Sequence, residues 1–340
     1  MAEEKVYRVA LIGCGDIAQT GHVPSLLAHK RFKIACLCDN RPERTKLLAA
    51  QAGGVETCND YRLLLNRKDI DAVILALHPE VSVDVAIDFL RYGKPVLDEK
   101  PLATNLNDAR RLIKVVEESK GVYQIGFVFG YADPIHRLGQ MARQLGTPAL
   151  YRVALRDEIA DRANTEHFNR IQQILRHSAA ITHEGSHVVD FVKHWNASPY
   201  TQVQASAIKT EPDFAGPNIW LARYDMTDGS VLEVEVAWFL PAFLPCEVSI
   251  EARGGSLRYD LSAGMGELRT RNKTEPFQLS PLSQPWARQL DGFAASIDAG
   301  RSLTAPIQRG WDALAATMAA EESVATGRPV AVRKFESQRA

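Results

Sequence analysis

Two short segments of this 340-residue chain carry side chains suited to proton transfer. In the first, Glu99 and Lys100 precede Pro101 at the end of an apolar run, and proline disfavours a helical conformation for the lysine before it. In the second, His183 and His187 are four residues apart at the start of a predicted helix, so both fall on one helical face. An ammonium and an imidazole can polarise a substrate oxygen and accept its proton.

A glycine-rich turn near the start of the chain predicts a reaction partner for these groups. Residues 6–12 form a β-rich run that leads into the letters Gly-Cys-Gly-Asp-Ile-Ala, after which helical spacing begins. In a dinucleotide fingerprint the first glycine permits the turn, the second lets the backbone approach a pyrophosphate, and a small residue lets the helix pack closely. The pyrophosphate then meets helix amides. We therefore predict cofactor contacts from Gly13, Gly15, Asp16, Ile17 and Ala18.

The end of the second predicted strand, residues 32–38, indicates which dinucleotide is preferred. Asp39 follows this strand about 20 residues after Ala18, the spacing expected for a ribose-binding acid. A carboxylate accepts hydrogen bonds from a free 2′-hydroxyl and repels a 2′-phosphate, so Asp39 favours NAD. Arg41 would offset part of that repulsion, which leaves NADP as an alternative.

Further strands and helices alternate as a parallel sheet requires: a strand at residues 71–77, a helix at 81–91 and a strand at 95–97. Ligands bind at the carboxyl ends of such strands. We therefore add Leu77, His78, Glu99 and Lys100 to the predicted cofactor contacts, with the Lys100 ammonium beside the nicotinamide. The competing interpretation of Lys100 is a solvated surface lysine.

The second half of the chain has a different pattern. A helix is predicted at residues 108–119, and a strand at 122–129 leads away from the nucleotide domain. From residue 202 onward, strands succeed one another at residues 203–208, 219–224, 231–239, 248–252, 257–260 and 267–270, which favours a mostly antiparallel sheet. Helices follow at 286–299 and 310–323. We predict an α/β protein with a dinucleotide-binding domain over residues 1–124 and a substrate-binding and oligomerisation α+β domain over 125–340.

A polar stretch at residues 156–177 is long enough to fold over a cleft, and long loops are often functional. Arginines in it suit a carboxylate, sulfonate or phosphate on a sugar. Arg156 and Arg176 are the best candidates because they flank the strand end and the helix with the histidines. A solvated loop surface is the alternative for any single arginine.

Composition excludes several other classes of protein. Forty basic residues are balanced by 41 acidic ones, for a net charge of -1, and no long basic run indicates a nucleic acid or an anionic membrane as partner. The N-terminus is charged and no apolar stretch approaches the ~20 residues of a membrane span, so we expect a cytoplasmic protein. Five cysteines, an odd number, are most simply reduced thiols.

The letters His183-Glu184-x-x-His187 also satisfy a zinc-protease pattern. An extended zinc motif would require glycine where Asp190 stands and histidine where Lys193 stands. A protease also has no obvious use for a dinucleotide fingerprint. We therefore predict no metal and keep a zinc hydrolase as a minor alternative.

The letters around Gly13, the strand-end Asp39 and the run Glu-Lys-Pro-Leu-Ala from Glu99 to Ala103 resemble the family of glucose-fructose oxidoreductase, inositol dehydrogenase and MocA (Gfo/Idh/MocA), over nearly the whole chain. The resemblance implies an N-terminal Rossmann domain, with a doubly wound parallel sheet, before a domain with a large open sheet. That sheet is commonly the dimer interface, so a homo-oligomer, dimer or tetramer, is expected. The resemblance also implies that Lys100 assists proton transfer at the substrate.

In this family the helix with the histidines reads Asp-x-Gly-x-His-x-x-Asp. Gly185, His187 and Asp190 match it, whereas His183 stands in place of the first aspartate. An imidazole can hydrogen-bond a hydroxyl but supplies no fixed negative charge. We expect His187 to take the hydroxyl proton, Lys100 to polarise the developing oxyanion and His183 to position substrate. Two helix histidines satisfied by backbone groups are the alternative.

These features together predict an NAD-dependent dehydrogenase or reductase that acts on a secondary alcohol or ketone of a sugar, cyclitol or sugar derivative, neutral or anionic. The first alternative is an enzyme that oxidises a sugar transiently, cleaves or eliminates a neighbouring bond and returns the hydride to the substrate. A sugar or nucleotide sensor without catalytic activity is a further alternative.

Overall fold

The computed structural model describes residues 5–304 and 306–336, which divide into two compact units. Unit 1 comprises the chain up to Val128, the segment Gln284–Trp311 and the residues from Phe335 onward. Unit 2 comprises Phe129–Ser283 and Asp312–Lys334. The sequence analysis expected a single boundary after residue 124. In the structure the chain also returns to unit 1, at Gln284.

Unit 1 is built on a six-stranded parallel sheet with the strand order β3-β2-β1-β4-β5-β6. Its strands are β1 (Tyr7–Ile12), β2 (Phe32–Cys38), β3 (Glu56–Cys58), β4 (Ala72–Leu75), β5 (Val96–Asp98) and β6 (Tyr123–Ile125). β4 is buried at every residue, as expected of a strand covered on both faces. The strand order reverses between β1 and β4, and ligands bind at the carboxyl ends of the strands at such a point. This arrangement confirms the predicted doubly wound sheet.

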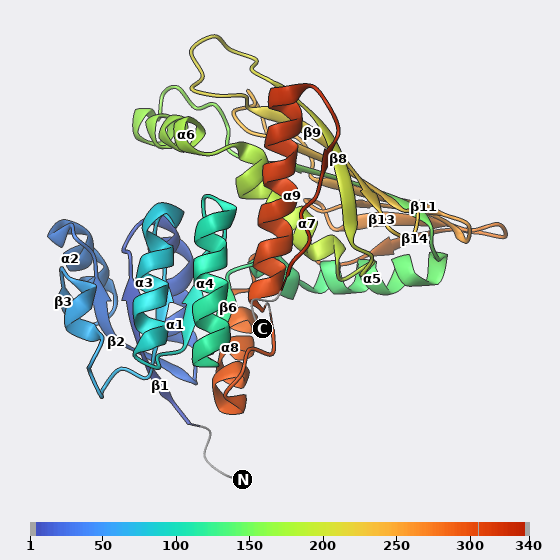
Figure 1. The fold of residues 1–340 in the computed structure, drawn as a ribbon. Coiled ribbons are helices and arrows are strands. Elements are labelled where there is room, and N and C mark those ends of the chain that lie inside the picture. Colours follow the sequence, from blue (N-terminus) through green and yellow to red (C-terminus); the bar gives the residue numbers. More distant parts are fainter. Residues whose placement is uncertain (1–4, 305, 337–340) are drawn as a thin grey trace. The chain divides into compact units, whose positions relative to one another are not determined.

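Helices flank this sheet (Figure 1). They are a π-helical turn η1 (Ala18–His22), α1 (Val23–Ala28), α2 (Pro42–Gln51), the 3-10 turn η2 (Tyr61–Leu64), α3 (Pro79–Arg91), α4 (Leu106–Ser119) and α8 (Trp286–Ala299). The strand predicted at residues 122–129 differs from β6 in length and in place. β6 ends at Ile125 and pairs with β5, so it completes the nucleotide sheet, and a 3-10 turn, η3 (Val128–Tyr131), follows.

The returning helix α8 completes the core of unit 1. Leu290, Phe293 and Ala294 belong to one buried cluster with residues of β1 and β2. The Phe293 ring stacks on Phe32 of β2 with 6.0 Å between the centroids. Without α8 this side of the sheet would expose apolar side chains to water, so residues 1–124 alone do not contain the complete core of unit 1.

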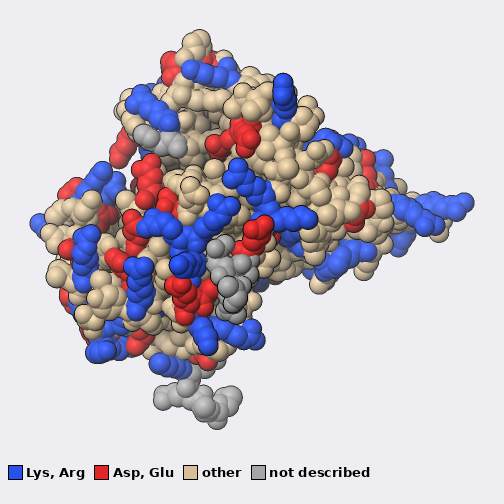
Figure 2. Space-filling view, viewed as in Figure 1, with Lys and Arg blue, Asp and Glu red and all other residues tan. Residues whose placement is uncertain are grey.

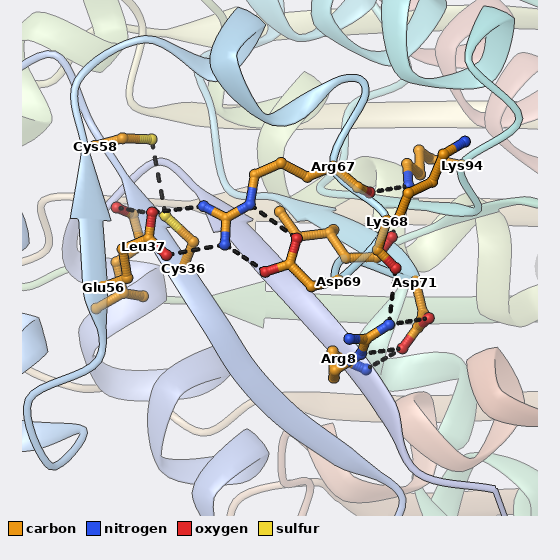
Figure 3. Close-up of polar contacts among 11 residues, drawn as sticks. Arg8, Cys36, Leu37, Glu56, Cys58, Arg67, Lys68, Asp69, Asp71 and Lys94 are labelled. Carbon is orange, nitrogen blue, oxygen red and sulfur yellow. Dashed lines mark hydrogen bonds and ion pairs between the residues drawn. The ribbon is translucent and has the colours of Figure 1, made fainter.

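Ion pairs join the segments at the amino-terminal ends of the strands, opposite the glycine turn (Figure 3). Arg8 at the start of β1 contacts Asp71, with 3.1 Å between Nε and Oδ2. Arg67 contacts both Glu56, at 2.9 Å, and Asp69, at 3.0 Å. These contacts leave the carboxyl ends of the strands as the edge suited to a ligand.

Unit 2 is built on a nine-stranded sheet with the order β14-β13-β12-β11-β7-β10-β9-β8-β15. Its strands are β7 (Ala149–Arg156), β8 (Tyr200–Ile208), β9 (Ile219–Met226), β10 (Val231–Ala237), β11 (Glu247–Ala252), β12 (Gly255–Asp260), β13 (Met265–Arg269), β14 (Thr274–Gln278) and β15 (Val330–Ala331). β10 and β7 run parallel and the other pairs are antiparallel. This confirms the large, mostly antiparallel sheet.

Alternate residues of the central strands face a buried and a polar side of this sheet. On β10, Leu232, Val234 and Val236 are buried, whereas Glu233 and Glu235 are partly exposed. The polar side is hollowed by about 1020 Å³, and Arg152, Arg156 and glutamates of β10 and β11 line the hollow. β10 therefore presents its apolar residues to the core and its glutamates to the other side of the sheet.

The helices of unit 2 are α5 (Asp133–Leu145), α6 (Thr165–His177), the π-helical turn η4 (Ile181–Gly185), α7 (Ser186–Val192) and α9 (Ile307–Thr326), whose first residues belong to unit 1. Helix α6 corrects the prediction of a loop over residues 156–177. The Oδ1 atom of Asn164 caps it by accepting the His167 amide. Ile171 is buried, and Phe168 stacks on Phe239 with 4.9 Å between the centroids, so an amphipathic face stabilises this helix.

The surface carries both signs of charge. Figure 2 shows lysine and arginine intermingled with aspartate and glutamate on the viewed face, in agreement with the net charge of -1. In the described part of the chain, no helix is both long enough and apolar enough to cross a membrane.

Candidate active site

The glycine turn of unit 1 lies at the carboxyl end of β1 and has the form that a dinucleotide requires. Gly13 has φ +94°, and a Cβ there would lie 2.2 Å from the carbonyl oxygen of Ala76, so this position excludes any side chain. A Cβ on Gly15 would meet only the Arg44 Nη1 atom, at 3.8 Å. The backbone at Gly15 is therefore open to a ligand such as a pyrophosphate.

The residues after this turn start the first helix as predicted. Asp16 is exposed, Ile17 is partly buried, and Ala18 is fully buried at the beginning of η1. The Gln19 amide donates to the carbonyl oxygen of Gly15 at 3.0 Å. The small side chain of Ala18 thus permits the close packing of helix and strand that the fingerprint demands.

Asp39 lies beside the glycine turn. Its Oδ2 atom accepts the Cys14 backbone amide and its Oδ1 atom accepts the Arg41 amide, both at 2.8 Å. Each oxygen keeps a second lone pair that can accept a ribose hydroxyl. Arg41 is exposed. Arg44 on α2 lies close to both Gly15 and Cys14, and the sequence analysis did not select it. The available signal was its position three residues after Arg41, just past Pro42, which favours the start of a helix.

The ends of β4 and β5 contribute the remaining predicted cofactor residues. The Leu77 Cδ2 atom is 3.2 Å from the Cβ position of Gly13, so Leu77 borders the turn. His78 precedes α3 and is exposed. Glu99 and Lys100 follow β5 directly, both are partly buried, and the peptide bond between Lys100 and Pro101 is cis. One edge of the unit 1 sheet therefore carries the glycine turn, Asp39 and Lys100.

Asp98, the last residue of β5, is a buried acid that the sequence analysis did not single out. It accepts hydrogen bonds from the hydroxyls of Ser82 and Tyr123, the latter at 2.9 Å. Burial raises the pKa of Asp98 to about 7, and the two hydroxyl donors oppose that shift only in part. The sequence feature that could have identified Asp98 is its place at the end of an apolar strand.

Unit 2 carries both histidines. His183 lies in η4 and is partly buried, with its ring centroid 5.5 Å from that of Trp238. His187 lies in α7 and is buried, with its ring 4.6 Å from that of Phe129. Gly185 lies between them, and a Cβ there would lie 2.6 Å from the Ile181 Cδ1 atom, so the end of that side chain would have to shift. The two imidazoles therefore pack against different aromatic rings.

Glu158 is a candidate site residue that the sequence analysis missed. Its Oε2 atom lies 3.1 Å from the His167 Nε2 atom, and its Oε1 atom lies 3.5 Å from the Arg170 Nη2 atom. Burial raises the pKa of Glu158, and the negative charges of Asp157 and Glu184 add to this effect. Glu158 also has φ +56°, an uncommon conformation for a residue other than glycine. No local sequence pattern signals such a backbone conformation.

The two arginines selected as anion-binding candidates differ in their surroundings. Arg156 ends β7, and its guanidinium contacts Glu235 at 2.7 Å and Glu247 at 3.2 Å. Arg176 is exposed on α6. Arg156 therefore already has carboxylate partners within unit 2, which its position in the sequence did not reveal.

In the described residues, 5–304 and 306–336, there is no group of three or more histidine, cysteine, aspartate or glutamate side chains that could hold a metal ion. The cysteines there are free thiols. Burial raises the pKa of both Cys14 and Cys36 to about 12, as expected of cysteines that contribute to packing.

Comparisons with known proteins agree with this geometry. Residues 7–127 match the family model described as "Oxidoreductase family, NAD-binding Rossmann fold". Inositol 2-dehydrogenase 2 of Saccharopolyspora erythraea is 27% identical over 339 residues, which cover 94% of this chain and 93% of that protein. A dTDP-3,4-didehydro-2,6-dideoxy-alpha-D-glucose 3-reductase of Actinomadura kijaniata is 36% identical over 130 residues, and these cover 38% of this chain and only 39% of the reductase.

One solved structure has a similar fold over both units of this chain. The crystal structure of an oxidoreductase from Agrobacterium radiobacter, in complex with NAD+, L-tartaric acid and magnesium, has a TM-score of 0.84 and 22% sequence identity. The match covers 96% of this chain and 98% of that one. The fold and the glycine turn define an NAD(P)-dependent oxidoreductase. More narrowly, the match of residues 7–127 to this family model and the inositol dehydrogenase relatives support a Gfo/Idh/MocA family oxidoreductase.

Proposed function

We propose that this protein is an NAD-dependent dehydrogenase or reductase that transfers a hydride between nicotinamide and a secondary alcohol or ketone of a neutral sugar, cyclitol or sugar derivative. The observation that carries the proposal is the single edge of the unit 1 sheet that bears the glycine turn, Asp39 and Lys100. The names of the inositol dehydrogenase and sugar reductase relatives support the substrate class.

Residues of this chain would hold the dinucleotide and move the proton. Gly15 leaves room for the pyrophosphate, and Asp39, fixed by the Cys14 and Arg41 amides, accepts the ribose hydroxyls. NAD, when bound, supplies the acceptor for the hydride. His187 takes the proton of the substrate hydroxyl, and Lys100 donates a hydrogen bond to the same oxygen as its charge develops. His183 positions the substrate.

The cofactor preference depends on Asp39. Its carboxylate would lie next to the ribose 2′-position, where a 2′-phosphate is repelled, so we propose NAD as the natural cofactor. Arg41 and Arg44 lie close by and are the residues that would allow some use of NADP.

A neutral substrate is favoured by the charge balance of unit 2. The guanidinium of Arg156 contacts two glutamates, and Arg162 contacts Asp213 with 2.7 Å between Nη1 and Oδ2. An anionic substrate would have to displace these carboxylates before it could pair with either arginine. Arg176 is the remaining candidate for an anionic group on the substrate.

The test is to follow nicotinamide absorbance while the protein, supplied with NAD, meets a panel of neutral and anionic sugars and cyclitols, with product analysis of each mixture. Reduction of NAD by a neutral polyol supports the proposal. The His187→Ala and Lys100→Met variants should each lose turnover but keep NAD binding. Full activity in either variant would contradict its assigned role.

A second candidate function is kept open by His183, which stands where the family pattern described above has an aspartate. Some family members oxidise a sugar transiently, cleave or eliminate a neighbouring bond and recover the hydride. In the same panel, this activity would appear as a cleaved product without net reduction of NAD. A protein that binds NAD and a sugar but converts neither would instead be a sensor.

We also propose that the polar side of the unit 2 sheet packs against a second copy of this chain. The hollow on that side is lined by residues of both charges, among them Arg152, Glu233 and Glu251, so two copies present complementary groups to each other. Light scattering of the purified protein should give the mass of a dimer or tetramer. A monomer at micromolar concentration would contradict the proposal.

A further inference from the structure

A buried histidine of the first helix contacts the residue that precedes the proposed catalytic lysine. His22 is the last residue of η1, and its side chain is only 2% exposed. Its Nε2 atom is 2.9 Å from the Oε1 atom of Glu99. An ionised carboxylate can only accept a hydrogen bond, so His22 is the donor. All of these residues belong to unit 1.

The backbone around His22 is adapted to this contact. Residues 18–22 form a π-helical turn, which is rare in helices and is often found at functional sites. A Cβ on Gly21 would lie 2.7 Å from the Trp286 ring, so Gly21 permits a close approach of η1 to α8. The His22 ring then lies edge-on against Trp286, with 4.8 Å between the centroids.

Glu99 is enclosed on its other side as well. Its side chain is 11% exposed, and a Cβ on Gly126 would lie 3.0 Å from its carboxylate atoms. The Glu99 amide donates to the carbonyl oxygen of Leu75 at 3.0 Å. A carboxylate enclosed in this way requires a donor, because an unpaired buried charge is strongly unfavourable. His22 is that donor.

From these contacts we propose that His22 is a positioning residue for Lys100. By holding the Glu99 carboxylate against the first helix, His22 fixes the segment after β5 from which the Lys100 side chain extends. The same contact couples that segment to the helix that begins at the glycine turn. This proposal rests on the proposed function, because it assigns His22 to the hydride-transfer reaction through Lys100.

Two substitutions separate the hydrogen bond from packing. His22→Leu keeps an apolar side chain of similar bulk without a donor, whereas His22→Gln places an amide donor near the former Nε2 position. We expect His22→Leu to lower kcat at least about tenfold, because small displacements of a catalytic group have large effects on rate. The dissociation constant for NAD should change less than about threefold, and His22→Gln should recover most of kcat.

The matched control is His29→Leu. His29, at the C-terminal end of α1, has a side chain that is 8% exposed and pairs with Asp291 of α8, with 3.1 Å between Nε2 and Oδ1. The contacts that the structure gives for His29 include none with the segment after β5. His29→Leu should therefore lower the thermal unfolding temperature but leave kcat unchanged. An equal loss of kcat in both leucine variants would mean that His22 acts only through stability, and would overturn the proposal.

Combining His22→Leu with Glu99→Gln tests whether His22 acts through Glu99. Because the two residues are proposed to form one unit, the double variant should lose no more kcat than the more impaired single variant. Losses that multiply would show independent roles and would overturn the proposal.

A readout without substrate separates this proposal from the proposed function. The emission maximum of bound NADH should shift in both His22→Leu and Lys100→Met. In His22→Gln it should have the wild-type value. This pattern in a protein without turnover would support the positioning role and refute the proposed function. Wild-type emission from His22→Leu, with a shift in Lys100→Met, would overturn the positioning role whatever the turnover.

Discussion

Replacing Asp98 by asparagine should remove a large part of the pH dependence of the stability of unit 1. Asp98 is buried at the end of β5 and its folded-state pKa is about 7, against a reference value of 3.8. The folded state therefore binds more protons than the unfolded state between these two values. The stability that protonated Asp98 contributes is complete below about pH 4, falls as the pH rises, and is lost above about pH 7.

The magnitude follows from the two pKa values. Each pH unit between them changes the free energy of unfolding by about 1.4 kcal/mol. Between pH 5 and pH 8 the native protein should therefore lose roughly 2.5 kcal/mol through Asp98 alone. Asparagine is neutral at both pH values and has an amide of similar shape, so it can still accept a hydrogen bond from Ser82 or Tyr123.

Hydrogen–deuterium exchange of the peptide that covers β5 measures this effect within unit 1. We compare its free energy of opening in the native protein and in Asp98→Asn at pH 5 and pH 8. The control is Asp84→Asn on α3, whose carboxylate is exposed and pairs with Arg111, so its pH response should match that of the native protein. If the responses of Asp98→Asn and the native protein differ by less than about 1 kcal/mol, Asp98 does not hold its proton as argued.

Four further substitutions test other parts of the protein. Gly13→Ala should prevent unit 1 from folding, because its Cβ would overlap the Ala76 carbonyl, whereas Gly15→Ala should fold normally yet bind NAD at least about tenfold more weakly; circular dichroism and NAD titration separate the two outcomes. Asp39→Asn should weaken NAD binding about tenfold and reduce discrimination against NADP, as titration of both cofactors would show. Arg156→Ala should lower the stability of unit 2 by about 1 kcal/mol, because two glutamates lose their partner, and leave the Michaelis constant unchanged; a raised Michaelis constant would instead indicate substrate contact.

The nucleotide unit was accessible from the sequence because its signals are local. The glycine turn, the strand-end Asp39 and the apolar strands each depend on residues that are neighbours in the chain. The six-stranded sheet and the positions of Gly13, Asp39 and Lys100 on one edge agree with those predictions. The contact of His22 with Glu99 joins residues that are 77 positions apart, and no local pattern predicts it.

Unit 2 was less accessible from the sequence because its contacts join distant parts of the chain. Helix α6 follows a run of polar residues, and the prediction of a loop overlooked the helical spacing of Phe168, Ile171 and Leu175 within it. The partners of Arg156 come from β10 and β11, far along the chain. Its ion pairs with Glu235 and Glu247 could therefore not be predicted from the sequence. The conformation of Glu158 likewise depends on tertiary contacts, among them the Phe239 amide that donates to its carbonyl oxygen.

The return of α8 to the first unit makes most of unit 2 an insertion in a nucleotide-binding domain. Phe293 packs on Phe32 across more than 250 intervening residues, so a gene fragment that stops after β6 would encode the sheet without part of its core. Exchange of unit 2 for the corresponding part of a related chain would have to preserve both junctions, near Val128 and near Gln284. In such a chain, unit 2 is therefore altered more readily by changes within the insertion than by fusion of a new domain at one end.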